Sequence, residues 1–138
     1  IACAFAISKA MVNSGVADAV ARFIIGMSHH YGPHVLLAAV FIITNLFTEL
    51  ITNNAAAALA FPLALSISSQ MGVSPMPFFV VICMAASASF STPIGYQTNL
   101  IVQGIGNYKF TDFVRIGLPL NIITFLISIF LIPLIWPF

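Results

Sequence analysis

Two short polar clusters interrupt apolar stretches of the sequence, and their residues are suited to binding ions. The first is Thr52-Asn53-Asn54, which lies between the apolar run 35–51 and a run of alanines. A helix that starts at Asn54 or Ala55 exposes unpaired N–H groups and the positive end of its dipole. Such a terminus can hold a carboxylate or a sulfate without a charged side chain. The sequence therefore predicts that this cluster binds an anion.

The second cluster, Thr92-Pro93-Ile94-Gly95, interrupts the stretch 78–106 in the same way. A half-helix that resumes at Thr98-Asn99 has the same capacity for an anion. Polar backbone at membrane depth is tolerated only where protein or a water-filled cavity satisfies it. Two such interruptions indicate a substrate site near the middle of a bilayer.

The same clusters offer ligands for a small hard cation. Helices that end near Ile51 and Ser91 present unpaired carbonyl oxygens. The hydroxyls of Thr48 and Ser91 and the amide oxygen of Asn53 are further hard donors, which suit Na⁺. Neither cluster contains a lysine or an arginine. We therefore expect bound Na⁺, rather than fixed side chains, to offset the charge of the anion.

Glu49 is the only acidic residue deep within an apolar run. A carboxylate inside a membrane is costly and is functional by default. Two roles are open for it: to relay a proton, or to form structural hydrogen bonds near the tip.

Composition predicts an all-α integral membrane protein. Of the 138 residues, 61% are hydrophobic and 5% are charged, whereas a soluble domain has roughly a quarter charged residues. A soluble enzyme or a nucleic-acid-binding protein is excluded on this ground. The apolar start at Ile1, without a preceding Met, predicts that the chain is part of a longer protein.

The chain divides into segments that would position the two clusters. A last spanning helix is expected over 116–138, with Lys109, Asp112 and Arg115 before it at a water interface. Residues 1–10 look like the end of another span.

The segment 16–27 is expected to be an interfacial helix, with Asp18 and Arg22 forming an i,i+4 ion pair. The alternative is one continuous span over 1–27 with that pair buried. A polar loop over 28–34 follows. Its three histidines invite a metal site, but a solvated loop is the favoured interpretation: His29, His30 and His34.

Two segments are unusual for ordinary spans. In 35–69 each arm has about 16 residues, roughly 24 Å of helix, slightly short of a full crossing. We therefore predict short or interrupted helices here and over 78–106, where the second cluster lies. The alternative is that 52–54 forms a surface turn between two full spans.

The pairing of T-E-L-I-T-N-N-A-A-A-A with S-T-P-I-G-Y-Q-T-N-L-I-V resembles the divalent anion:sodium symporter family of dicarboxylate and sulfate carriers. In that family a Ser-Asn-Thr motif lies at the tip of each of two re-entrant hairpins, and a Thr-Pro break follows. The resemblance places the motif on Thr52, Asn53 and Asn54, and the break on Thr92 and Pro93.

The resemblance implies an architecture: the C-terminal half, or second inverted repeat, of an elevator-type transporter whose N-terminal half is missing. In it, 35–69 would be a re-entrant helical hairpin and 78–106 a discontinuous helix. Members work as homodimers, and the segment 16–27 would be the arm helix that joins scaffold and transport domain. By the same match, one Na⁺ would be held by Thr48, Asn53 and carbonyls near Ile51 and Ser91. The anion would contact the residues of the two motifs, including Thr92 and Pro93.

The predicted function is Na⁺-coupled symport of a small divalent anion by a multi-pass protein of the cell (inner) membrane. Asn54 and Gly95 depart from the dicarboxylate-type pattern and favour sulfate or another small oxyanion. Proton coupling or exchange is the alternative within transport; an anion channel and a non-transporting membrane subunit are alternatives of another class. An enzyme is not expected, because the sequence has no Ser/His/Asp spacing, HExxH or CxxC, and neither an organic cofactor nor a nucleic-acid partner is predicted.

Overall fold

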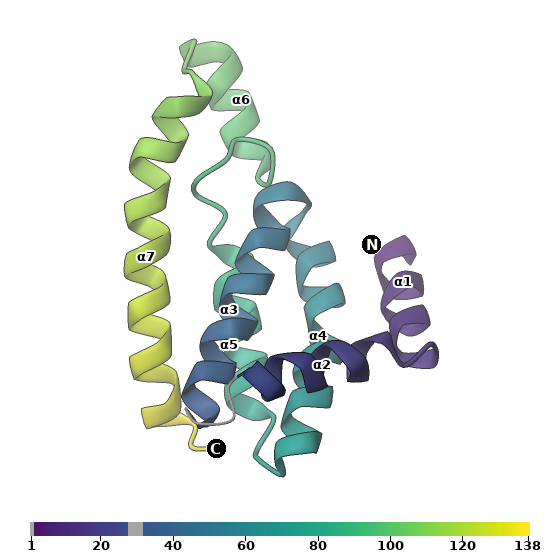
Figure 1. The fold of residues 1–138 in the computed structure, drawn as a ribbon. Helices are drawn as coiled ribbons and strands as arrows, with labels where there is room; N and C mark the ends of the chain where they lie inside the picture. Colours follow the sequence, from purple (N-terminus) through teal and green to yellow (C-terminus); the bar gives the residue numbers. More distant parts are fainter. Residues whose placement is uncertain (1, 28–31) are drawn as a thin grey trace.

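All regular secondary structure in the part that the structure describes is helical. The computed structural model describes residues 2–27 and 32–138, which contain helices and no strand (Figure 1). This confirms the all-α prediction. The helices are α1 (Ala2–Asn13), α2 (Val16–Met27), α3 (Pro33–Leu50), α4 (Asn53–Met71), α5 (Met76–Ser87), α6 (Gln97–Gly106) and α7 (Phe110–Ile135).

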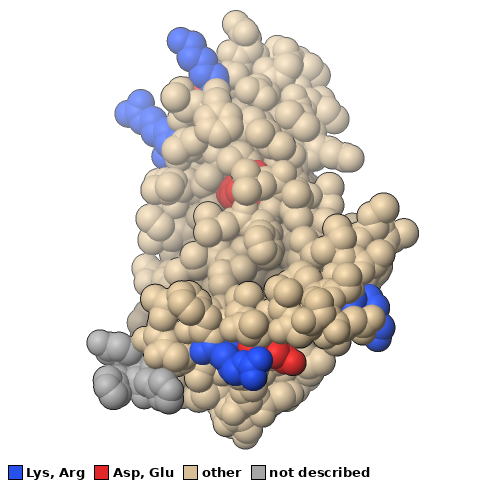
Figure 2. Space-filling view, turned by 45° about the vertical axis from the view of Figure 1, so that its right-hand side comes forward, with Lys and Arg blue, Asp and Glu red and all other residues tan. Residues whose placement is uncertain are grey.

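Within the described residues, α3 and α7 are each long and apolar enough to cross a membrane, and α1 with α2 qualifies if the bent pair counts as one span. On the face drawn in Figure 2, basic side chains lie near the upper and lower ends, and the surface between them is almost uncharged. This distribution is typical of a protein whose middle faces lipid.

The first two helices do not form one continuous span. Gly15, with φ 72°, allows a sharp break, and the axes of α1 and α2 differ by 70°. Asp18 and Arg22 are both exposed, so the buried pair of that alternative is wrong. The Asp18 carboxylate accepts a hydrogen bond from Ser66 of α4 and so attaches α2 to α4.

The last helix begins earlier than expected. Phe110, not Ile116, is its first residue, so Asp112 and Arg115 lie inside α7 instead of before it. The backbone N–H of Lys109 donates to Asp112 Oδ2 at 2.9 Å. A carboxylate in the first turn complements the helix dipole, which explains why the helix extends this far.

Helices α3 and α4 form a tight antiparallel pair with only Ile51 and Thr52 between them, and α4 begins at Asn53 rather than at Asn54 or Ala55. We call the connected ends of these two helices, around residues 48–54, the tip. In the view of Figure 1 the tip lies below α6, whereas α7 extends past the tip to the height of α6. Small side chains permit the close packing. The core of α3, α4 and α5 includes Leu37, Val40, Phe41, Ala60, Ala64, Phe78, Val81 and Ala85, each at most 2% exposed.

The break between α5 and α6 is longer than predicted. Helix α5 ends at Ser87 instead of near Ser91, residues 88–96 are non-helical, and α6 begins at Gln97, close to the expected Thr98. We refer to 88–96 as the break segment. It lies between the tip, where it contacts Glu49, and α7, where it contacts Asn121.

The histidines are only partly described. His29 and His30 lie outside the described residues. His34 belongs to α3 rather than to a loop, and its ring contacts Phe138 at 5.1 Å between centroids. The solvated loop stays a prediction.

Candidate functional site

The end of α3 contacts the end of α5. Asn45 Nδ2 donates to the carbonyl oxygen of Ala88 at 2.7 Å, and Thr48 Oγ1 lies 2.7 Å from that of Ala86. Ser89 Oγ in turn donates to the Thr48 carbonyl at 3.0 Å. Carbonyls at a helix end need partners, and here side chains of α3 supply them. This explains why α5 stops at Ser87.

Glu49 connects the tip to the break segment. Its Oε1 accepts from the backbone N–H of Ser91 at 2.9 Å, and its Oε2 from that of Thr92 at 2.7 Å. The Thr92 hydroxyl donates to the Glu49 carbonyl at 2.6 Å. With 8% of its surface exposed, the side chain is buried and its carboxylate is well supplied with donors. Of the two roles open for Glu49, these contacts fit the structural one.

Thr48 and Asn53, two of the predicted Na⁺ ligands, are in contact. Thr48 Oγ1 lies 2.9 Å from Asn53 Oδ1 and also 2.7 Å from the Ala86 carbonyl oxygen. A hydroxyl has a single proton and can donate fully to only one of two oxygens. When it donates to Ala86, the lone pairs of Thr48 and Asn53 face each other, an arrangement that a cation would stabilise.

At Ile51 the predicted ligand is the backbone carbonyl, and α3 ends there as expected: the Ile51 N–H donates to the Phe47 carbonyl at 2.8 Å. The hydroxyl of Ser91 accepts from Asn121 Nδ2 at 2.8 Å, so it is engaged with α7. The structure therefore brings Thr48 and Asn53 together, while the Ser91 side chain bonds elsewhere.

The residues predicted to bind the anion lie at the tip and in the break segment. Thr52 and Asn54 are exposed, and the Thr52 side chain does not cap α4. The first helical bond of α4 runs from the N–H of Ala56 to the Thr52 carbonyl at 2.9 Å. The N–H groups before Ala56 are therefore available to a ligand. Thr92 is half-buried and bonds Glu49, and Pro93, the next residue, is buried.

Sequence reasoning missed several residues that join the tip, the break segment and α7. One is Gly117, where a Cβ would lie 2.0 Å from the Phe90 carbonyl oxygen. Gly95, named above only as part of the second cluster, makes a similar approach: a Cβ there would lie 2.1 Å from the Thr48 carbonyl oxygen. Asn121 is one helical turn after Gly117. Its position in an apolar span was the available signal, since polar groups there are costly. The missed residues are Asn45, Ser89, Gly117 and Asn121.

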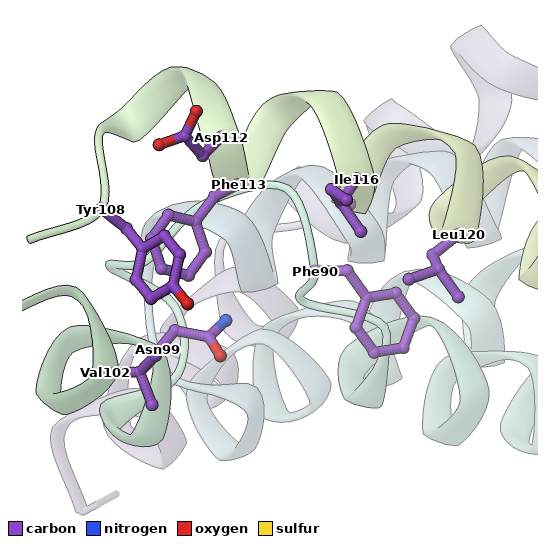
Figure 3. A pocket seen from close by; sticks show the side chains of 9 residues that line it. Phe90, Asn99, Val102, Tyr108, Asp112, Phe113, Ile116 and Leu120 are labelled. Carbon is purple, nitrogen blue, oxygen red and sulfur yellow. The ribbon is translucent and has the colours of Figure 1, made fainter. Parts of the chain in front are cut away.

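Two cavities border the break segment. One, of about 540 Å³, lies between α3 and α7, and its polar lining residues are Asn45, Glu49, Ser91, Thr92 and Asn121. The other, of about 410 Å³, lies between α6 and α7; Figure 3 shows Tyr108, Phe113 and Asn99 at one end of it and Phe90, Ile116 and Leu120 at the other. Neither is lined by residues 52–54, so these three residues lie outside both cavities, whereas Glu49 borders the larger one.

Comparison with known proteins gives consistent matches. The family model described as citrate transporter matches residues 1–138. The uncharacterized transporter YfbS of Escherichia coli (strain K12) is 43% identical over 126 residues, which are 91% of this chain and 20% of the relative. Sodium/sulfate cotransporter 1 of Chlamydomonas reinhardtii is 37% identical over 133 residues, 96% of this chain and 15% of the relative. The Na⁺/citrate cotransporter of Rattus norvegicus is 29% identical over 119 residues, 86% and 21% of the two chains. This chain thus spans 15–21% of the length of these relatives.

Proposed function

Because the chain belongs to the citrate transporter family, we propose that it is part of a secondary active transporter that couples Na⁺ entry to the uptake of a small divalent anion. The resemblance to sodium-coupled anion carriers is confirmed by the matches to sodium/sulfate and Na⁺/citrate cotransporters. The chain is an integral membrane protein of a transporter family.

The observation that carries the proposal is the contact between the α3–α4 tip and the break segment. Thr48 and Asn53 meet there, Glu49 bonds the backbone of Ser91 and Thr92, and the first turn of α4 has uncapped N–H groups. Oxygen donors for Na⁺ thus lie beside peptide N–H groups for an anion. A cation bound at this place would strengthen anion binding by direct attraction, so the two ions would bind cooperatively.

We take sulfate as the first candidate substrate and a dicarboxylate or citrate as the second. Relatives named sodium/sulfate cotransporters are 37–38% identical to this chain, against 29% for the Na⁺/citrate cotransporter. The amide of Asn54, exposed at the tip, can donate hydrogen bonds to a sulfate oxygen. On the substrate side, we propose that the anion contacts Thr52, Asn53, Asn54, Thr92 and Pro93.

The proposed architecture has α3 and α4 as a re-entrant hairpin, α5 and α6 as one discontinuous helix and α2 as the interfacial arm. The chain would form the C-terminal repeat of a longer, homodimeric, elevator-type protein of the cell (inner) membrane. This chain covers only 15–20% of the length of two relatives, which supports a longer protein. The tip that stops short of the level of α6 supports the hairpin (Figure 1).

The test is uptake of radiolabelled sulfate, citrate and succinate by the complete protein in proteoliposomes, with Na⁺ or choline outside. We expect sulfate accumulation only with a Na⁺ gradient. If a proton gradient without Na⁺ drives accumulation equally well, the coupling ion is H⁺ rather than Na⁺. Glu49 would then be the residue to examine as a proton relay. Downhill flux that no ion gradient can reverse would indicate a channel instead.

A further inference from the structure

The last helix reaches into the proposed site through one amide side chain. Asn121 Nδ2 donates to Glu49 Oε1 at 2.7 Å and to Ser91 Oγ at 2.8 Å. A primary amide has two N–H protons, so both bonds can form at once. Resting on the proposed function, we propose that Asn121 is a positioning residue that acts through Glu49 to hold Ser91 and Thr92 in the geometry that binds the coupling ion and the anion.

The orientation of the Asn121 amide follows from its neighbours. Rotating the amide by 180° would place its oxygen against the Glu49 carboxylate, two acceptors in contact. In the orientation present, Asn121 Oδ1 is buried and has no hydrogen-bond partner. Such an orphan acceptor costs free energy. The two N–H contacts to Glu49 and Ser91 must outweigh it, so they fix this side chain.

The carboxylate that Asn121 holds is the one that orders the break segment. Each Glu49 oxygen accepts a backbone N–H of the segment, from Ser91 or from Thr92. Neither N–H belongs to a helix, because residues 88–96 are non-helical. Hydrogen bonds to an ionised acceptor are about twice as strong as neutral ones. Asn121 therefore restrains two peptide groups through one shared carboxylate.

The backbone of α7 lies close enough to make these bonds. A Cβ on Gly117, one turn before Asn121, would be 2.0 Å from the Phe90 carbonyl oxygen and 2.6 Å from the Ser91 Cα. A glycine is needed for such an approach. Gly117 and Asn121 lie on the same face of α7. This face is thus built onto the break segment, and α7 should move together with the tip.

The test compares Asn121→Leu with Ser128→Ala in the complete protein. Leucine has nearly the shape of asparagine and removes only the two donors in use, since Asn121 Oδ1 has no partner. Ser128 is the matched control, because it lies on the same helix, is 2% exposed and its hydroxyl has no partner. The readouts are the Na⁺ concentration for half-maximal sulfate uptake, the maximal rate and the amount of protein in the membrane.

We expect Asn121→Leu to raise the half-saturating Na⁺ concentration at least about tenfold, the scale of losing hydrogen bonds to a charged group. Ser128→Ala should leave it unchanged. A purely structural role would lower only the maximal rate, in proportion to the protein present. An unchanged half-saturation in Asn121→Leu would therefore overturn the proposal.

If Asn121→Leu does not reach the membrane, the proposal is tested with two other variants: Asn121→Asp alone, and Asn121→Asp combined with Glu49→Gln. Asn121→Asp alone places two carboxylates together and should abolish Na⁺-dependent uptake. Adding Glu49→Gln restores one amide and one carboxylate across the contact, and uptake should recover above that of Asn121→Asp alone. An absence of recovery would count against direct action through Glu49.

Failure of the transport proposal is recognised separately, in the unmodified protein. If that protein takes up none of the three anions, the shift of its thermal midpoint in NaCl relative to KCl replaces uptake as the readout. A shift that Asn121→Leu removes supports the positioning role without transport. A shift that survives Asn121→Leu overturns it, and an unmodified protein that neither transports nor responds to Na⁺ overturns both proposals.

Discussion

Gly95 lies directly against the carbonyl oxygen of Thr48. A Cβ on Gly95 would be 2.1 Å from that oxygen and 2.2 Å from Ser89 Oγ. Gly95 itself is buried, so no open space lies beside it. The contact joins two segments that are separated by more than 40 residues in sequence, and it allows the break segment to lie on the tip.

Gly95→Ala should therefore separate the tip from the break segment and abolish Na⁺-dependent uptake. The methyl group would meet backbone, which cannot rotate away as a flexible side chain can. Uptake normalised to the amount of protein in the membrane is the measurement. Gly104→Ala is the control, because a Cβ at Gly104 meets nothing within 4 Å; it should keep full uptake. Equal uptake by the two variants would show that the close approach is dispensable.

Much of the helical order was predictable from apolar runs and breakers. The runs before and after residues 52–54 gave α3 and α4, and Gly15 marked the break between α1 and α2. These features are local, since hydrophobic periodicity and a left-handed glycine act within a few residues. The residue at which α5 ends could not be predicted from local sequence. It depends on Thr48 and Asn45, whose side chains bond carbonyls 38 and 43 residues away.

The site was predictable to a similar extent. Thr48 and Asn53 are separated by five residues and were expected together, and they are in contact at 2.9 Å. Asn121 was missed, because its partner Glu49 is 72 residues earlier. Likewise, i,i+4 spacing suggested an Asp18–Arg22 pair, but the tertiary contact to Ser66 offered Asp18 a bond that spacing could not reveal.

Thr48→Val should weaken Na⁺ binding, whereas Thr44→Val should not. Both threonines are fully buried on α3, one turn apart. The Thr44 hydroxyl donates within its own helix, to the Val40 carbonyl at 2.7 Å, while that of Thr48 contacts Ala86 and Asn53. Losing the Thr48 contacts should cost about 1–3 kcal/mol. We expect the half-saturating Na⁺ concentration to rise about tenfold or more in Thr48→Val alone. A similar change in both variants would assign the effect to packing.

Asn53→Ala should abolish Na⁺-dependent uptake while the protein still inserts in the membrane. The substitution removes the oxygen that lies 2.9 Å from Thr48 Oγ1, but alanine suits the first turn of α4 and is followed there by further alanines. Uptake and membrane abundance are measured together. Normal uptake kinetics in Asn53→Ala would refute the assignment of Asn53 to the Na⁺ site.

Glu49→Gln separates the two roles that were open for Glu49. A glutamine keeps one acceptor but turns an NH₂ group toward the N–H of Ser91 or Thr92, which weakens the attachment of the break segment. We expect a protein that is less stable by about 1–3 kcal/mol and takes up anion slowly, with the same dependence on external pH as the unmodified protein. Loss of that pH dependence, with thermal stability retained, would instead identify a proton relay.

Ser66→Ala should loosen the attachment of α2 to α4. The Ser66 hydroxyl donates to the Asp18 carboxylate and accepts from Gln70 Nε2 at 2.9 Å, so its loss leaves both groups with one partner fewer. Because Asp18 is exposed to water, we expect a loss of only about 1 kcal/mol, near the average for one hydrogen bond. Ser69→Ala is the control: Ser69 borders the same small hollow of about 210 Å³ but is exposed. The thermal midpoint of the purified complete protein, measured in detergent, should fall for Ser66→Ala and stay constant for Ser69→Ala. Equal midpoints would mean that α2 is held by its buried alanines, Ala17 and Ala21, and not by this polar contact.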